Sequence, residues 1–108
     1  MLKIVQSSEY QRDYARLKKT GYDLSVLNAE VQRLARSDEE PLEPEYVRAF
    51  NVHELEADYE GYSDLHLDDS ADDWVLVFKL TDTELKLART GTHEEVFPSP
   101  KRNYWKPW

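Results

Sequence analysis

The chain has 108 residues, no cysteine and a formal net charge of −8 at neutral pH. This length is typical of one domain, and the lack of cysteine excludes disulfide scaffolds, thiolate zinc sites and cysteine nucleophiles. No apolar run approaches the roughly 20 residues that span a bilayer, and the N-terminus lacks the apolar segment of a secretory signal, which predicts a cytoplasmic protein without a membrane partner.

The first third of the chain predicts one strand and two helices. Residues 2–5 are apolar and include Ile and Val, which favours a short strand. Ser8 and Gln11 fit a capping box that opens a helix, and Thr20–Gly21 ends it. Leucine and valine recur every three or four residues over 24–34, so a second helix is expected to complete a helical hairpin.

The rest of the chain predicts loops and strands. Residues 38–45 hold two prolines and five acidic residues, which indicates a loop, and 46–56 is interpreted as a loop with short strand pieces. Three strands are expected at 62–67, 74–80 and 84–90. The stretch 74–80 (WVLVFKL) is almost continuously apolar, which favours a central strand covered on both faces.

Helices and strands are segregated along the chain, so the predicted fold class is α+β: an antiparallel sheet packed against an N-terminal helical hairpin. We expect a single domain over residues 1–97. Residues 98–108 hold three prolines and three large aromatic residues, which predicts a separate C-terminal tail.

Charge divides the chain into three parts. Residues 1–36 carry seven basic and four acidic side chains, residues 37–74 one and fourteen, and residues 75–108 six and four. The corresponding net charges are +3, −13 and +2. An acidic field repels nucleic acid phosphates, whereas the basic flanks leave local contact surfaces. The acidic block is either a solvated face or a surface for a basic partner.

The three histidines, His53, His66 and His93, all lie in the second half of the chain. Imidazole changes charge near neutral pH and therefore suits proton transfer. Asp64 lies two residues before His66, which places both side chains on one face of a strand. Arg89 precedes His93 by four residues, and a guanidinium beside an imidazole suits phosphate chemistry.

Two other interpretations of these residues remain open. Each histidine is individually more often structural than catalytic, and the three together with Asp64 or Asp73 offer ligands for Zn²⁺ or Ni²⁺. The sequence contains no H-x-x-x-H or H-E-x-x-H motif that would strengthen the metal interpretation. Trp74 and Phe78 fit strand packing better than a platform for base stacking.

Three segments in the second half nevertheless follow a known pattern. The runs GYSDLHL, DWVLVFKLTD and LKLARTGTHEEVF, within about residues 53–97, resemble the YafQ branch of the RelE/ParE toxin superfamily. That family carries a G-Y-R-D-x-H strand, a D-W-x-L-x-Y-K strand and an R-T-G-[ST]-H-x-x-L-F ending. The predicted N-terminal strand and helical hairpin fit the same RelE-like fold.

The resemblance implies the toxin of a type II toxin–antitoxin pair, a ribosome-dependent endoribonuclease that cuts mRNA without a metal or other cofactor. The implied partners are a cognate antitoxin, the ribosome and mRNA, and DNA only as the toxin–antitoxin complex. The implied catalytic set is His93, His53, His66, Asp73 and Arg89, and the implied substrate-binding set is Asp64, Trp74 and Phe97.

The family chemistry implies a role for each catalytic residue. His93 protonates the 5′-oxygen leaving group as general acid, and His53 or His66 removes the proton from the ribose 2′-hydroxyl as general base. Arg89 stabilises the charge that develops on the phosphate. Asp73 orients an imidazole or holds it cationic, because a nearby negative charge favours the charged form.

The chain departs from the family pattern in ways that lower its expected affinity for RNA. Its net charge is negative, the acidic segment 68–73 lengthens the connection after His66, and Ser63 replaces the usual arginine or lysine of the G-Y-[RK]-D motif. The alternative function is therefore a weakly active or inactive superfamily member that serves as a protein-binding module. A small metal-binding enzyme is the third hypothesis.

Overall fold

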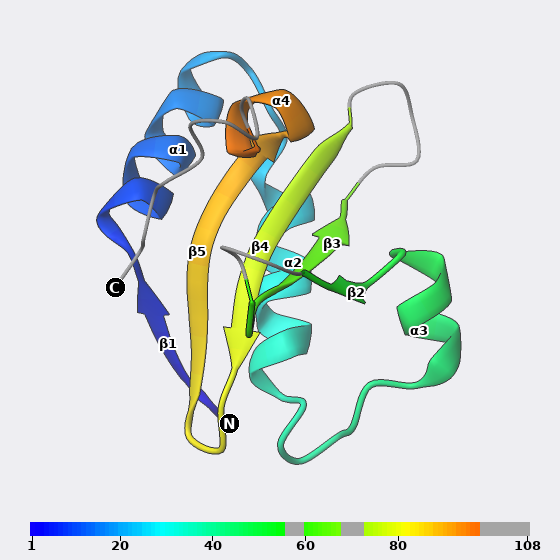
Figure 1. Cartoon of the computed structure of the whole chain (residues 1–108). Coiled ribbons are helices and arrows are strands. Elements are labelled where there is room, and N and C mark those ends of the chain that lie inside the picture. Colours follow the sequence, from blue (N-terminus) through cyan, green and yellow to red (C-terminus); the bar gives the residue numbers. More distant parts are fainter. Residues whose placement is uncertain (56–59, 68–72, 98–108) are drawn as a thin grey trace.

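The computed structural model describes residues 1–55, 60–67 and 73–97 and contains helices and strands in the predicted order (Figure 1). The elements are β1 (Lys3–Gln6), α1 (Ser8–Lys19), α2 (Leu24–Ala35), α3 (Pro44–Ala49), β2 (His53–Glu54), β3 (Ser63–His66), β4 (Trp74–Leu80), β5 (Glu84–Thr92) and α4 (His93–Val96). The α+β class is confirmed. The predicted tail at 98–108 lies outside the described residues.

The sheet has five strands in the order β1-β5-β4-β3-β2. Strands β2 to β5 pair antiparallel, as predicted, but β1 pairs with β5 in parallel, so the sheet as a whole is mixed. A parallel neighbour needs a long crossover connection, which a hairpin turn cannot supply. Helices α1 and α2 begin this connection, and in Figure 1 α2 lies behind the sheet and α1 beside β5.

Both long helices begin at side-chain caps. The hydroxyl of Ser7 accepts a hydrogen bond of 2.9 Å from the backbone N–H of Tyr10, so α1 begins one residue earlier than the predicted capping box at Ser8. Asp23 caps α2 by accepting hydrogen bonds from the N–H and hydroxyl of Ser25, and these bonds lower the pKa of Asp23. Ser7 also donates to the carbonyl of Ala88 at 2.6 Å, which fixes the start of α1 against β5.

Two apolar clusters cover the two faces of β4. The larger cluster joins the buried stripes of α1 and α2 to one face of the sheet and includes Leu17, Leu27, Leu34, Leu76 and Leu85. The smaller cluster lies on the opposite face and consists of Val75, Val77, Ala88 and Val96. The prediction of a central strand covered on both faces is therefore confirmed, and β4 has the predicted bounds of 74–80.

Two short helices were not predicted. Helix α3 lies in a segment assigned to a loop because of its prolines and charges, but Pro44 occupies the first helical turn, where a missing N–H costs nothing. The hydroxyl of Tyr46 in α3 donates to Glu30 of α2 at 2.8 Å. Helix α4 begins directly at the end of β5, which runs two residues past the expected strand end at residue 90.

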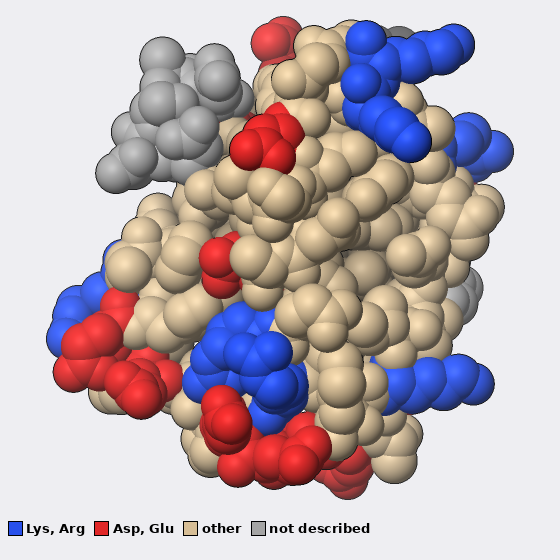
Figure 2. Space-filling view, turned by 180° about the vertical axis from the view of Figure 1, so that it is seen from behind, with Lys and Arg blue, Asp and Glu red and all other residues tan. Residues whose placement is uncertain are grey.

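Basic and acidic side chains separate only partly on the surface. In the view from behind, basic side chains lie at the upper right, the side of α1, whereas the acidic ones that gather at the lower left and bottom have other basic side chains among them (Figure 2). Helix α1 carries three basic residues in its last turn. Within the described part of the chain, no helix has the length and apolar character needed to cross a membrane.

Candidate active site

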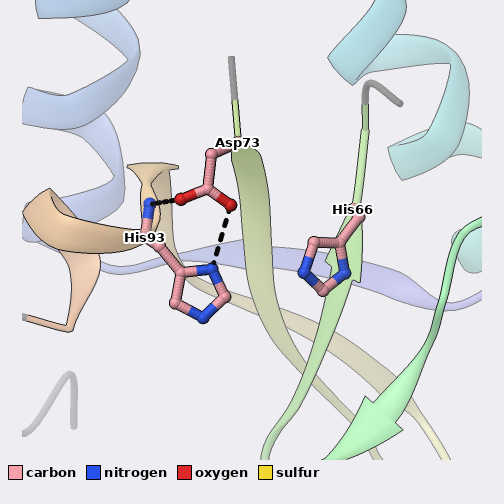
Figure 3. Close-up of side chains that lie close together, drawn as sticks. All are labelled: His66, Asp73 and His93. Carbon is pink, nitrogen blue, oxygen red and sulfur yellow. Dashed lines mark hydrogen bonds and ion pairs between the residues drawn. The ribbon is translucent and has the colours of Figure 1, made fainter. Parts of the chain in front are cut away.

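Three polar side chains meet at the end of the sheet where β4 begins and β5 ends (Figure 3). His66 is the last residue of β3, Asp73 directly precedes β4, and His93 is the first residue of α4. The antiparallel register brings them together, since His66 pairs with Val75 and Trp74 pairs with Thr92. Residues 27 positions apart in sequence, such as His66 and His93, thereby share one site.

His93 is held by Asp73 through its ring and its backbone. Nδ1 of His93 lies 3.2 Å from Oδ1 of Asp73, and the backbone N–H of His93 lies within hydrogen-bonding distance of both Oδ2 (3.3 Å) and the carbonyl (3.2 Å) of Asp73. A carboxylate accepts and does not donate, so this contact places a proton on Nδ1 and leaves Nε2 for a ligand. Asp73 adopts a φ of +53°, in the left-handed region that Asp tolerates better than most residues.

His66 lies across the site from His93. The two ring centroids are 5.7 Å apart, and one ligand atom from each of His66, Asp73 and His93 lies within 4.8 Å of the others. The side chains of His93 and Asp73 are 45% and 51% exposed, so a ligand from solvent reaches them. Two imidazoles and a carboxylate in this arrangement suit proton transfer.

The same three residues form a set of potential metal ligands. Two imidazole nitrogens and one carboxylate oxygen match the donors that Zn²⁺ and Cu²⁺ use in proteins. The metal hypothesis raised by the sequence therefore acquires a defined set of atoms. Of the two carboxylates that the sequence offered, Asp73 and not Asp64 belongs to this set.

Two aromatic residues of the implied substrate-binding set lie near the site but differ in exposure. The ring of Phe97 lies 5.2 Å from that of His93 and is partly exposed, so it extends the site beyond α4. Trp74 is only 4% exposed, its Nε1 donates to the hydroxyl of Thr90 at 2.9 Å, and its ring meets Tyr22 edge-on. The structure thus gives Trp74 a place in the core, where it supports the start of β4.

Arg89 lies in a different environment from the one that the sequence implied. Its Nε and Nη2 donate to the two carboxylate oxygens of Asp13 in α1, at 2.7 and 3.1 Å. The Arg89 side chain is 14% exposed and that of Asp13 is 4% exposed. This bidentate pair joins α1 to β5, so much of the charge of Arg89 is directed at Asp13.

His53 and Asp64 occupy opposite backbone positions on neighbouring strands. They are register partners in the antiparallel pair of β2 and β3. Asp64 is 1% exposed, so it is buried, unlike the exposed side chains of Asp73 and His93. The side chain of His53 lies outside what the structure describes, and its role stays a prediction.

A hollow of about 730 Å³ lies along the other end of β3 and β4. Its walls include Glu54, Tyr62, Ser63 and Phe78. Ser63 pairs with Phe78, three residues along β3 from His66, so the hollow lies toward the opposite end of β3 from His66. None of the residues that line it belongs to the predicted site.

Sequence reasoning missed a group of charged residues behind the site. Asp13 and Arg16 of α1 and Glu95 of α4 form contacts that connect α1 to the helix carrying His93. The one local signal was the T-x-x-E spacing of Thr92 and Glu95, which is typical of a capping box. The contacts of Asp13 span 76 residues of sequence and follow no local pattern.

Comparisons with known proteins match most of this chain and its fold. A family model described as "Bacterial toxin of type II toxin-antitoxin system, YafQ" matches residues 2–98. The mRNA interferase toxin YafQ of Escherichia coli K12 is 33% identical over 94 residues, which cover 87% of this chain and 94% of that protein.

Solved structures agree with the sequence comparisons. The E. coli DinJ–YafQ toxin–antitoxin complex contains a chain that matches with a TM-score of 0.73 and 31% identity, covering 89% of this chain and 97% of that one. A metal-bound toxin from Helicobacter pylori matches with a TM-score of 0.71 and 32% identity, covering 90% and 100%. The chain therefore belongs to the YafQ family of bacterial toxins of type II toxin–antitoxin systems.

Proposed function

We propose that the chain is a ribosome-dependent mRNA endoribonuclease in which His66, Asp73 and His93 form the catalytic centre. The observation that carries this proposal is the approach of two imidazoles to 5.7 Å around a carboxylate on an exposed face. The match to proteins named mRNA interferase toxin supports it. Ser63 lies outside this centre, and the acidic block of residues 37–74 contributes Asp73 to it.

The reaction is the attack of a ribose 2′-oxygen on the adjacent phosphorus, with loss of the 5′-oxygen of the next nucleotide. His66 or His53 removes the 2′-hydroxyl proton, and His93 donates a proton from Nε2 to the leaving 5′-oxygen. Asp73 orients the ring of His93 by holding Nδ1 and the backbone N–H. The products are a 2′,3′-cyclic phosphate and a free 5′-hydroxyl.

Binding residues surround this centre in the proposal. Phe97 stacks against a base or sugar beside His93, because its ring lies 5.2 Å away and is partly exposed. Asp64 and Trp74 are buried and act by supporting the strands β3 and β4 beside His66 and Asp73. Arg89 acts on the phosphate at most through its long-range charge, because Asp13 already binds its guanidinium.

The proposed reaction needs no metal ion, because two imidazoles supply the acid and the base. A metal at the same three residues would instead occupy the nitrogen that His93 needs for proton transfer. We therefore expect cleavage to continue in excess chelator and to fall when Zn²⁺ is added. Loss of cleavage in chelator, with recovery on adding Zn²⁺, would favour the metal-enzyme hypothesis.

The proposed partners are the ribosome with bound mRNA and a cognate antitoxin. The family description and the DinJ–YafQ complex of E. coli support the antitoxin, which would bind and inhibit the toxin. Ribosomes place the reaction in the bacterial cytoplasm.

Induced expression in bacterial cells tests the proposal. We expect wild-type protein to arrest growth and create new mRNA 5′ ends, and His93→Ala to do neither while remaining folded. Glu94→Ala is the matched control, because Glu94 is an exposed neighbour in the same helix. Normal growth with soluble wild-type protein would favour the inactive protein-binding module.

A further inference from the structure

A series of contacting charged side chains connects the interior of the molecule to the helix that begins with His93. It starts at Asp13, whose side chain is 4% exposed. Asp13 accepts hydrogen bonds from Arg89, from Nη1 of Arg16 at 2.9 Å and from the backbone N–H of Thr90 at 3.1 Å. A buried carboxylate with this many donors is fixed in one position.

Arg16 connects Asp13 to α4. Its Nη1 binds Asp13, and its Nε lies 3.4 Å from Oε2 of Glu95. Because the guanidinium is planar and rigid, it relates the two carboxylates by a fixed geometry. Helix α1 thereby sets where Glu95 lies.

Glu95 uses its second oxygen to hold the start of α4. Oε1 accepts a hydrogen bond of 2.9 Å from the N–H of Thr92, while the N–H of Glu95 donates to the hydroxyl of Thr92 at 3.2 Å. This capping box surrounds His93, which lies between the two residues. One carboxylate thus joins the ion pair with Arg16 to the cap of the helix that carries the imidazole.

Gly91 leaves the room that this arrangement needs. Its φ is +152°, and a Cβ atom there would lie 2.9 Å from Oε1 of Glu95 and 3.0 Å from Nη2 of Arg16. That Nη2 is buried, with no hydrogen-bond partner in the described structure. The charged groups therefore pack directly against the backbone of β5, two residues before His93.

We infer that Arg16 and Glu95 are positioning residues of the catalytic centre, which fix the imidazole of His93 through the cap of α4. This inference rests on the proposed nuclease function for its kinetic consequence. It adds a second support to the one that Asp73 gives directly. Asp73 holds the ring and N–H of His93 from the β4 side, and Arg16 with Glu95 holds its helix from the α1 side.

The test compares Arg16→Gln, Glu95→Gln, the double variant and Arg12→Gln. Glu95→Gln keeps the capping box, because glutamine also serves at that position, but loses the charge that binds Arg16. Arg12→Gln removes a cation from the same helix, where Arg12 is 71% exposed and pairs with Glu9. Two readouts are needed: kcat and KM for mRNA cleavage on ribosomes, and the imidazole nitrogen NMR signals of His93.

We expect Arg16→Gln and Glu95→Gln each to shift the His93 signals and to lower kcat about tenfold, since small displacements of catalytic groups have effects of this order. Their KM should change no more than that of Arg12→Gln. The double variant should be no slower than the slower single variant, because either single change already removes the contact between Arg16 and Glu95. Melting temperatures confirm that the variants are folded.

Three results would overturn the inference. Unchanged His93 signals in both single variants would show that the contacts do not position the ring. A raised KM with unchanged kcat would make Arg16 an RNA contact. Multiplicative effects in the double variant would make the two residues independent. If the wild-type protein cleaves nothing, the proposed function fails, while the NMR readout still decides whether Arg16 and Glu95 position His93.

Discussion

Asp13 in α1 binds the end of β5, and Asp73, directly before β4, binds the first residue of the helix that follows β5. Asp13 is 4% exposed and binds two arginines and a backbone N–H. Asp73 is 51% exposed and binds the ring and backbone of His93. The buried carboxylate fixes elements that are distant in sequence, whereas the exposed one holds a group that still faces solvent.

This difference in exposure leads us to expect that Asp13 mainly affects the stability of the fold and Asp73 mainly affects catalysis. A charge that is surrounded by buried partners is costly to remove, because the partners are then left buried without compensation. A charge that is half exposed contributes little to folding but orients an imidazole for a ligand. Substitutions in the two groups should therefore separate the two properties.

The largest effect is expected from His93→Gln in the exposed group. Glutamine cannot donate or accept a proton in the reaction, so the cleavage rate should fall by about 10²–10⁴-fold, the usual contribution of a general acid. Because the His93 side chain is 45% exposed, the melting temperature should change little. A variant that cleaves at the wild-type rate would remove His93 from the mechanism.

Asp13→Ala should have the largest effect on folding. It leaves the guanidinium of Arg89 and the N–H of Thr90 without their buried acceptor. We expect the free energy of unfolding to fall by about 3 kcal/mol, the lower end for a broken buried ion pair, because Arg16 is 39% exposed and regains water. Chemical denaturation measures the change, and a loss below 1 kcal/mol would contradict the assigned role of Asp13.

Asp73→Asn tests the exposed carboxylate alone, because asparagine tolerates the positive φ at this position. The backbone is kept, but the amide no longer supplies a carboxylate for Nδ1 of His93. We expect the cleavage rate to fall about 10-fold to 100-fold while the unfolding free energy changes by less than about 1 kcal/mol. Equal losses of stability in Asp73→Asn and Asp13→Ala would contradict the expected difference between the exposed and the buried aspartate.

The smallest effect is expected from Arg12→Ala, which removes an exposed ion pair from α1. Arg12 binds Glu9 at 3.1 Å, but its side chain is 71% exposed. Exposed pairs stabilise proteins weakly, so the unfolding free energy should change by no more than about 0.5 kcal/mol. A loss as large as that of Asp13→Ala would show that burial does not explain the difference between the two carboxylates.

The sequence predicted most of the fold because its signals are local. The apolar run at 74–80 and the leucine and valine repeat at 24–34 each report one element, and both elements formed there. The four residues of α4 are too few to show a helical period. The parallel pairing of β1 with β5 depends on a crossover and could not be read from strand patterns.

The candidate site was predicted through family resemblance more than through residue patterns. Spacing along the chain pairs Asp64 with His66, whereas the folded protein brings Asp73 to His93. The partner of Arg89 was missed because Asp13 lies 76 residues away, on a helix whose visible pattern is an apolar stripe. Long-range contacts between charged residues leave no local signal in one sequence.

Acid–base catalysis by the histidine centre is tested most directly by the RNA ends that the purified protein produces. The wild type and His93→Gln are each incubated with ribosome-bound mRNA, and the chemical groups at the new ends are identified. Acid–base catalysis by the histidine centre predicts 2′,3′-cyclic phosphate and 5′-hydroxyl ends from the wild type in the presence of chelator, and no such ends from the variant. Ends with a 3′-hydroxyl and a 5′-phosphate, or equal cleavage by the variant, would contradict it.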